Sequence, residues 1–397
     1  MLFIIVIAFS VLLYHLAKKR IVFLTSYYGV KSRSLPEYYG INIASWNFII
    51  STIVIFVLWL LKHLGYIINY TYGYLIVIAI SSNMIIYIFA KLKVRYRAQE
   101  HCEKLFSWTL NIATFFSIVI TITIFITIFF EAIKFFNIIP IENFILGLKW
   151  SPQSSGTIDE TIFGVVPILT GTLLIVLIAM IIAIPLGILS AIYLVEYTDK
   201  NLRNIIKPLL EILAGVPTIV YGYFAVLVVG PLIRIIGESF GLEVSTESAL
   251  AAGIVMGMMI IPFVLSLSDD AIASVPQNLR EGALALGSTK AEMIIKVIVP
   301  AASPGILSGI LLAISRAVGE TMIVTMAAGI NAKLTFNPLD SVSTFTAQIV
   351  ALLVGDQEFD SPKTLSAFAL ALALFVITLI LNICAMIIIK KKTKIYE

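Results

Sequence analysis

Long apolar runs separated by short polar connections form the main pattern along this chain. About twenty apolar residues in a helix cross the roughly 30 Å hydrocarbon core of a bilayer, and runs of that length recur throughout the sequence. We therefore predict an all-α fold, a polytopic transmembrane helical bundle. The expected spans are residues 1–17, 43–61, 72–90, 108–130, 162–185, 208–234, 246–268, 303–328 and 365–389.

Composition agrees with a membrane bundle and excludes other classes of protein. Of the 397 residues, 60% are hydrophobic and 13% are charged, which leaves too few polar side chains to cover a soluble globule. The surroundings are then membrane lipid and not nucleic acid, because the basic residues lie in short runs beside apolar segments. The two cysteines and three histidines show no metal-ligand spacing and no catalytic pattern, so we expect no metal, cofactor or catalytic residue.

Positive charge predicts the orientation in the membrane. Most of the 27 Lys and Arg residues fall in connections on one side of the alternating spans. These basic runs are residues 18–33, 91–104, 200–207, 280–296 and 390–394. The positive-inside rule makes that side cytoplasmic, which places the N-terminus outside and the C-terminus in the cytoplasm. The first span lacks a charged leading region and a cleavage site, so we expect an uncleaved anchor.

Polar content divides the chain near residue 105. The three leading spans hold few polar residues, whereas the later spans contain prolines, glycines and ionisable groups. We expect an N-terminal accessory region of about three helices over residues 1–104 and a transport domain over residues 105–397. Proline inside a span requires that the freed backbone groups face protein or a water-filled cavity, which favours a transport bundle over a simple anchor.

Two predicted outward connections, residues 131–161 and 329–364, are long enough to contact something outside the membrane. The first contains Trp150-Ser-Pro152 followed by a Ser/Gly patch. The second carries four acidic residues, which are Asp340, Asp356, Glu358 and Asp360. Solvated connections without a partner are the alternative, and the residues alone do not separate the two interpretations.

A polar insert over residues 268–300 interrupts the apolar pattern. Residues 278–296 mix apolar and polar positions, which predicts one or two short amphipathic helices beneath the membrane. Small residues there permit close approach to a partner, and a carboxylate offers a polar contact. A rigid helix lodged in a moving partner transmits its motion to the bonded span. The candidate docking residues are Glu281, Gly282, Ala283 and Gly287.

Arg316 and Glu320 are expected near the middle of the span over residues 303–328, where an unpaired charge costs about 2.5 kcal/mol or more. One interpretation is a structural ion pair on one helical face. Such pairs contribute only about 0.3–0.5 kcal/mol at exposed sites, too little to offset two buried charges. The other, which we favour, is a substrate path in which the Arg316 guanidinium binds an oxyanion transiently, Glu320 holds Arg316 between substrates and Thr321 supplies a hydroxyl.

Three segments together resemble the phosphate ABC-transporter permease family, specifically its PstC-type subunit. They are the insert with Glu281-Gly-Ala-Leu-Ala-Leu-Gly287 and Val297-Ile-Val-Pro300, the string Arg316-Ala-Val-Gly-Glu-Thr-Met-Ile-Val-Thr-Met326, and Glu211-Ile-Leu-Ala-Gly-Val-Pro-Thr-Ile-Val-Tyr-Gly222. The resemblance covers about residues 105–390. It implies an ABC-importer type I permease core of six helices, preceded here by about three N-terminal accessory helices. Ser34-Leu-Pro-Glu-Tyr-Tyr-Gly40 resembles the N-terminally extended members.

The resemblance also implies the partners and the reaction. The partners are a second, PstA-type permease subunit, a cytoplasmic ATPase dimer and an external phosphate-binding protein. Inorganic phosphate would cross the inner membrane, and ATP would be hydrolysed by the separate ATPase subunit, so the chain itself is not an enzyme. The family's pore arginine and glutamate match Arg316 and Glu320, and its coupling loop matches Glu281, Gly282, Ala283 and Gly287.

Two rival functions remain open. A permease for another oxyanion, such as molybdate, sulfate or a phosphonate, would keep the coupling loop and change the pore, and the chemistry of Arg316 indicates only an oxyanion. An ion-coupled secondary transporter would contain inverted repeats and several carboxylates at the bilayer midplane. The sequence contains one interior carboxylate and no clear repeat, which disfavours that second rival.

Overall fold

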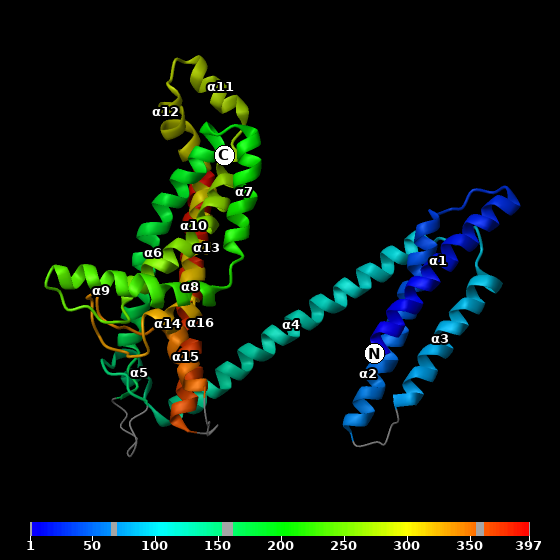
Figure 1. The fold of residues 1–397 in the computed structure, drawn as a ribbon, viewed down its shortest axis with the longest axis horizontal. Coiled ribbons are helices and arrows are strands. Elements are labelled where there is room, and N and C mark those ends of the chain that lie inside the picture. Colours follow the sequence, from blue (N-terminus) through cyan, green and yellow to red (C-terminus); the bar gives the residue numbers. More distant parts are fainter. Residues whose placement is uncertain (1, 65–69, 153–161, 355–360, 397) are drawn as a thin grey trace. The chain divides into compact units, whose positions relative to one another are not determined.

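A computed structural model describes residues 2–64, 70–152, 162–354 and 361–396 (Figure 1). Within these residues every regular element is helical, apart from one isolated antiparallel bridge between Trp150 and Phe163. The all-α fold class is therefore confirmed. The chain separates into two compact units, residues 1–123 and 124–397. The Ser/Gly patch after Pro152 and the acidic residues Asp356, Glu358 and Asp360 lie outside the described residues.

Three helices and the start of a fourth form the N-terminal unit. They are α1 (Leu2–Tyr28), α2 (Pro36–His63), α3 (Tyr70–Lys91) and the first part of α4 (Ala98–Ile138). Leu13, Ala17, Ile43 and Ile88 are buried where α1, α2 and α3 pack together. The Tyr39 hydroxyl lies 2.8 Å and 2.7 Å from the carbonyl oxygens of Val94 and Tyr96, which ties the segment before α4 to α2.

The second unit contains the remaining helices. They are α5 (Ile141–Leu146), α6 (Val166–Ile192) with its π-helical turn η2 (Tyr193–Tyr197), α7 (Lys200–Ala214), α8 (Thr218–Phe224), η3 (Ala225–Val229), α9 (Gly230–Ser239), α10 (Ala249–Ala273), α11 (Gln277–Ala285), α12 (Lys290–Met293), η4 (Ile294–Ile298), α13 (Val299–Val318), α14 (Met322–Ala327), α15 (Phe345–Leu353) and α16 (Pro362–Tyr396). The π-helical turns join neighbouring helices, so that α6, the α8–α9 segment and the α12–α13 segment each run long enough to cross a bilayer.

Seven helices of the described residues are long and apolar enough to cross a membrane. They are Pro36–Leu61, Ala98–Ile138, Val166–Tyr197, Thr218–Ser239, Ala249–Ala273, Lys290–Val318 and Pro362–Ile387. The six that begin at Ala98 or later correspond to the six expected core helices. The other two expected spans coincide with α1, whose apolar stretch ends at Lys18, and α3, whose apolar part is the shorter helix Ile78–Ile88.

α10 packs against both α6 and α13 at the centre of the second unit (Figure 1). Small residues allow these helices to approach closely, as is typical in membranes. A Cβ atom added at Gly253 would lie 2.7 Å from the Ile178 side chain, and one added at Gly309 would lie 2.9 Å from Leu267. The fit leaves no room for larger side chains at these two positions.

The span expected over residues 208–234 is displaced in the structure. Residues up to Ala214 belong to the separate amphipathic helix α7, and the crossing helix begins only at Thr218. Pro217 explains the break, because proline lacks an N–H group and disfavours helical conformation in the residue before it. The hydropathy pattern predicted one span across this break because the residues on both sides of Pro217 are apolar.

Candidate functional site

Arg316 lies in the last turn of α13 and not in the middle of an unbroken helix. α13 ends at Val318, and a new short helix, α14, begins at Met322. The Met322 N–H donates to Glu320 Oε1 at 3.2 Å, so the Glu320 carboxylate accepts a bond from the start of the new helix. The expected continuous span over residues 303–328 is therefore interrupted, and Glu320 lies in the interruption.

The two charged residues are not paired in this structure. Glu320 is buried, with 8% exposure, and its carbonyl oxygen accepts from Thr346 Oγ1 at 2.7 Å. Arg316 is exposed, and its guanidinium carbon lies 5.6 Å from the centre of the Phe263 ring on α10. Within the described residues the guanidinium makes no ion pair or hydrogen bond with an acidic side chain. The helical spacing assumed for a structural pair fails because Glu320 lies beyond the helix end.

Thr321 lies beside Glu320 in the same interruption. Its hydroxyl is 3.4 Å from the Gly319 carbonyl oxygen, a long contact, and its own carbonyl accepts from Thr325 Oγ1 at 2.7 Å. The Thr321 side chain is half-buried. The structure thus brings the three candidate path residues together at one helix break, with a cationic group on one side of it.

The segment after α14 is tightly built. Gly329 has φ +96°, and a Cβ atom there would lie 2.2 Å from Ser341 Oγ, so the position favours glycine. Asp340 accepts from Thr335 Oγ1 at 2.7 Å and from Lys333 Nζ at 3.2 Å. The Thr335 hydrogen bond and then the Lys333 contact hold the pKa of Asp340 below its usual value. This acidic residue therefore orders its own segment.

The two long outward connections contact each other. Trp150 Nε1 donates to Gln348 Oε1 at 3.0 Å, and Gln348 Nε2 donates to the Ile330 carbonyl at 2.5 Å and to Ser343 Oγ at 3.0 Å. A cavity of about 270 Å³ opens beside these groups, lined by residues that include Ser151 and Asn331. Whether this surface contacts a molecule outside the membrane stays a prediction.

The polar insert forms two short helices, as expected. α11 follows α10 after a turn at Pro276, and α12 begins with a capping box in which Thr289 and Glu292 each bond the other's backbone N–H. Gly287 ends the first helix with φ +86°, and the N–H groups of Gly287 and Ser288 donate to the carbonyls of Leu284 and Ala283. Gly287 is therefore required by backbone conformation.

The candidate docking residues differ in where they face. Glu281 and Gly282 are exposed, and an added Cβ at Gly282 would meet nothing within 4 Å. Ala283 is instead buried, and it packs with Met293 and Ile294 of the same chain. Exposed leucines flank the surface, and Leu286 at its tip is 89% exposed.

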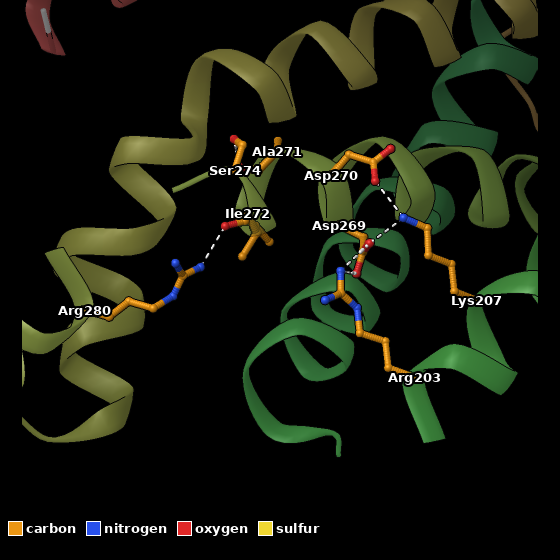
Figure 2. Close-up of polar contacts among 8 residues, drawn as sticks. All are labelled: Arg203, Lys207, Asp269, Asp270, Ala271, Ile272, Ser274 and Arg280. Carbon is orange, nitrogen blue, oxygen red and sulfur yellow. Dashed lines mark hydrogen bonds and ion pairs between the residues drawn. The ribbon is translucent and has the colours of Figure 1, made fainter. Parts of the chain in front are cut away.

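A buried ion cluster missed by the sequence analysis lies near the C-terminal end of α10 (Figure 2). Asp269 is fully buried and accepts from Arg203 Nη2 at 2.9 Å and 2.8 Å and from Lys207 Nζ at 2.8 Å. Lys207 also donates to Asp270 at 2.6 Å. Burial lowers the pKa of Lys207, but the bonds to Asp269 and Asp270 outweigh it, so the pKa is raised above its usual value. These contacts fasten α7 to α10.

Arg280 holds the start of the two-helix insert. Its Nη2 donates to the Ile272 carbonyl at 2.8 Å (Figure 2). Its Nε donates to Glu196 Oε1 at 3.1 Å, and its Nη1 donates to the Val275 carbonyl. The side chains of Arg280 and Glu196 are 12% and 7% exposed. Because Glu196 belongs to η2 and Ile272 to α10, this arginine joins α11 to two core helices. The sequence analysis missed this role of Arg280, and its position directly before the candidate docking residue Glu281 was the signal that could have revealed it.

A bundle of long apolar helices with a polar two-helix insert, and an arginine at a helix break without an acidic partner among the described residues, fits a membrane transport permease. The chain belongs to the family described as the inner membrane component of binding-protein-dependent transport systems, whose model matches residues 183–394. It is therefore a multi-pass inner-membrane protein of a family of transport subunits. ABC importers of this family work with an ATPase and a substrate-binding protein.

Two curated relatives make the assignment more specific. The chain is 33% identical over 318 residues to the phosphate transport system permease protein PstC of Haemophilus influenzae, covering 75% of this chain and 96% of that protein. It is 35% identical over 239 residues to the Probable ABC transporter permease protein YqgH of Bacillus subtilis, covering 60% and 74%. These similarities confirm the resemblance to PstC-type permeases and favour it over an ion-coupled secondary transporter.

Among solved structures, the inward-facing MetNI methionine ABC transporter is similar to this chain. The match covers 57% of this chain and 93% of the MetNI chain, at 17% sequence identity and a TM-score of 0.43.

Proposed function

We propose that this chain is the permease subunit that carries inorganic phosphate across the inner membrane in an ATP-driven importer. The observation that carries the proposal is the Arg316 guanidinium, which is exposed at the end of α13 without a carboxylate partner among the described residues. A guanidinium donates paired hydrogen bonds that match the oxygens of phosphate. Relatives with this fold bear the name of phosphate transport permeases.

The helix break gives the arginine its position in this proposal. A charge in an apolar bundle is costly unless something compensates it, and a passing anion does so only while it is bound. Glu320 is buried in the break, and its carboxylate accepts a hydrogen bond from the first residue of α14. It therefore fixes the backbone that presents Arg316. Thr321, one residue further, offers a hydroxyl to a phosphate oxygen. These roles make Arg316 the ligand and Glu320 its positioning residue.

The two-helix insert is the proposed contact with the ATPase. Glu281, Gly282 and the exposed Leu286 would face the partner, while Ala283, Gly287 and Arg280 give the insert its shape. Closure of an ATPase dimer would push α11, and the bonds of Arg280 would pass that motion to α10 and to the end of α6. Hydrolysis of ATP would take place in the ATPase, and no catalytic role is assigned to this chain.

The remaining partners and the orientation follow from the same proposal. A second, PstA-type permease subunit would complete the path beside Arg316, and an external phosphate-binding protein would deliver the anion. The basic runs place α11 in the cytoplasm, the C-terminus on the same side and the N-terminus outside.

Substrate identity is tested by uptake of labelled phosphate into vesicles that contain the whole assembly. We expect uptake that requires ATP on the side of the membrane where the ATPase lies. The uptake should also require the binding protein and be unaffected by excess sulfate or molybdate. Competition by either anion would favour the permease for another oxyanion, and uptake without ATP would contradict the ABC importer.

A further inference from the structure

A groove in the N-terminal unit is built from apolar side chains of three helices. It encloses about 600 Å³, within the range of ligand pockets, between α1, α2 and the start of α4. Ile7 and Val11 of α1, Phe48 of α2, and Leu105 and Phe106 of α4 line it. A groove with this lining in a membrane protein fits a hydrocarbon chain.

One polar group in the groove lacks a strong partner. Asn42 lines it, is 5% exposed, and its amide nitrogen Nδ2 has no well-formed hydrogen bond among the described residues. The Cys102 thiol, a weak acceptor that also lines the groove, is the polar group beside it. Asn47, five residues later on α2, has hydrogen-bond partners for both ends of its amide. Its Nδ2 donates to Ser10 Oγ at 3.0 Å, and its Oδ1 accepts from Ser81 Oγ at 3.1 Å. A buried amide donor without a strong acceptor is costly, so an oxygen atom of a bound molecule would stabilise the Asn42 amide.

The depth of Asn42 indicates which acceptor that is. α2 has 28 residues and is about 42 Å long, close to the bilayer thickness with headgroups included. Asn42 lies six residues after its first residue, about 9 Å along the axis, where headgroups meet hydrocarbon. The ester carbonyls of phospholipids lie at this boundary. An ester oxygen there can accept from Asn42 while its acyl chain fills the groove.

Positive charge lies one helical turn from the groove. Tyr14 lines the groove, and Lys18 Nζ lies 5.9 Å from the centre of its ring and 3.1 Å from Glu37 Oε1. Lys18 and the exposed Lys19 line a second, separate hollow on α1. Lys18 is already paired with the Glu37 carboxylate. We therefore assign the contact with an anionic headgroup to Lys19, whose side chain is exposed.

We propose that this groove is a binding site for one anionic phospholipid. An acyl chain lies between α1, α2 and α4, an ester carbonyl accepts from Asn42 Nδ2, and the phosphate lies near Lys19. The site lies on the accessory helices α1 and α2 and on the start of the core helix α4, and its proposal does not rest on the proposed phosphate transport. It gives these helices a role in binding membrane lipid.

The test measures lipid retained by the full-length chain with native mass spectrometry. The chain is equilibrated in detergent with mixtures of phosphatidylglycerol and phosphatidylcholine that carry the same acyl chains. We expect one retained phosphatidylglycerol, bound in preference to phosphatidylcholine. Asn42→Leu should raise the phosphatidylglycerol fraction needed for half occupancy roughly fivefold, the effect of about one hydrogen bond. Lys19→Gln should remove the preference for phosphatidylglycerol.

Two further variants separate binding from folding. Ser45→Trp fills the groove while keeping the Asn42 side chain and should abolish retention, whereas Asn111→Leu changes an exposed asparagine on α4 outside the groove and should leave retention unchanged. Retention equal to wild type in both Asn42→Leu and Ser45→Trp would overturn the site. Crosslinking of Ser45→Cys to a helix of another subunit, with no lipid retained by the wild type, would also overturn it.

Discussion

Arg280 holds the two-helix insert through three acceptors, one of them the buried Glu196 carboxylate. Replacing Arg280 by Met leaves that carboxylate buried without its partner, and breaking a buried pair in this way costs about 3–5 kcal/mol. We expect Arg280→Met to lower the thermal stability of the chain and its co-purification with the ATPase.

A matched control exists for this change. Lys296 forms an exposed pair with Glu292, with side chains 71% and 46% exposed, and such pairs contribute about 0–1 kcal/mol. Lys296→Met should therefore be almost silent. The double variant Arg280→Met/Glu196→Gln should recover part of the loss. Equal melting temperatures for Arg280→Met and Lys296→Met would contradict the role given to Arg280.

Lys207 predicts how the contact between α7 and α10 depends on pH. Its pKa is raised above the usual 10.5, so its stabilising contribution is complete below pH 10.5 and is lost as the pH rises through the higher folded-state value. We expect thermal stability to decline in that alkaline range. Lys207→Met should lack the step, and a step of the same size in this variant would assign it to another group.

At the scale of single helices, the two glycines of the insert make opposite predictions. Gly287 has φ +86°, so Gly287→Ala forces a left-handed conformation that costs about 1–2 kcal/mol. Gly282 is helical and has open space around its Cβ position, so Gly282→Ala should stabilise the isolated chain by about 1 kcal/mol. Melting curves of the purified chain measure both effects.

The same positions distinguish folding from docking. Gly282→Leu should leave the chain folded and weaken its capture of the ATPase, because it adds bulk to the surface proposed to face that partner. Unchanged capture by Gly282→Leu would remove Gly282 from the docking surface, whatever its effect on melting.

The elements predicted from hydropathy are largely those observed, since membrane helices must bury apolar length. Boundaries set by single residues were missed. Pro217 divides an apolar run that reads as one span, and Gly319 with Glu320 ends α13 inside another. The ion cluster was also missed, because Asp269 and its partner Arg203 are 66 residues apart and periodicity carries no information about such pairs. The insert was found because polar residues between membrane spans are conspicuous.

At the scale of the whole molecule, the expected nine spans place the termini on opposite sides. Six core helices and α2 have membrane length, whereas α1 and α3 do not reach that criterion in the described residues. If both cross, or if neither does, the number of spans is odd and the termini are on opposite sides. We therefore expect a C-terminal fluorescent fusion to be cytoplasmic and an N-terminal alkaline phosphatase fusion to be active outside.

The alternative outcome has a clear structural meaning. Both fusions reporting the same side would mean that only one of α1 and α3 crosses the bilayer. If that side is the cytoplasm, the result would contradict only the orientation inferred for the N-terminus, whereas both fusions outside would contradict the inferred position of α11 as well.

The central claim is that phosphate passes the Arg316 guanidinium while α11 couples the chain to ATP hydrolysis. The most direct test is the rate of ATP-dependent phosphate import by the reconstituted assembly at a phosphate concentration below saturation. Arg316→Ala should lower this rate roughly tenfold to hundredfold, the effect of losing charge-assisted bonds, with assembly and ATPase binding preserved. Arg234→Ala, which removes an exposed arginine paired only with Glu238 in the described residues, should keep the rate of the wild type. An unchanged rate in Arg316→Ala would contradict the account.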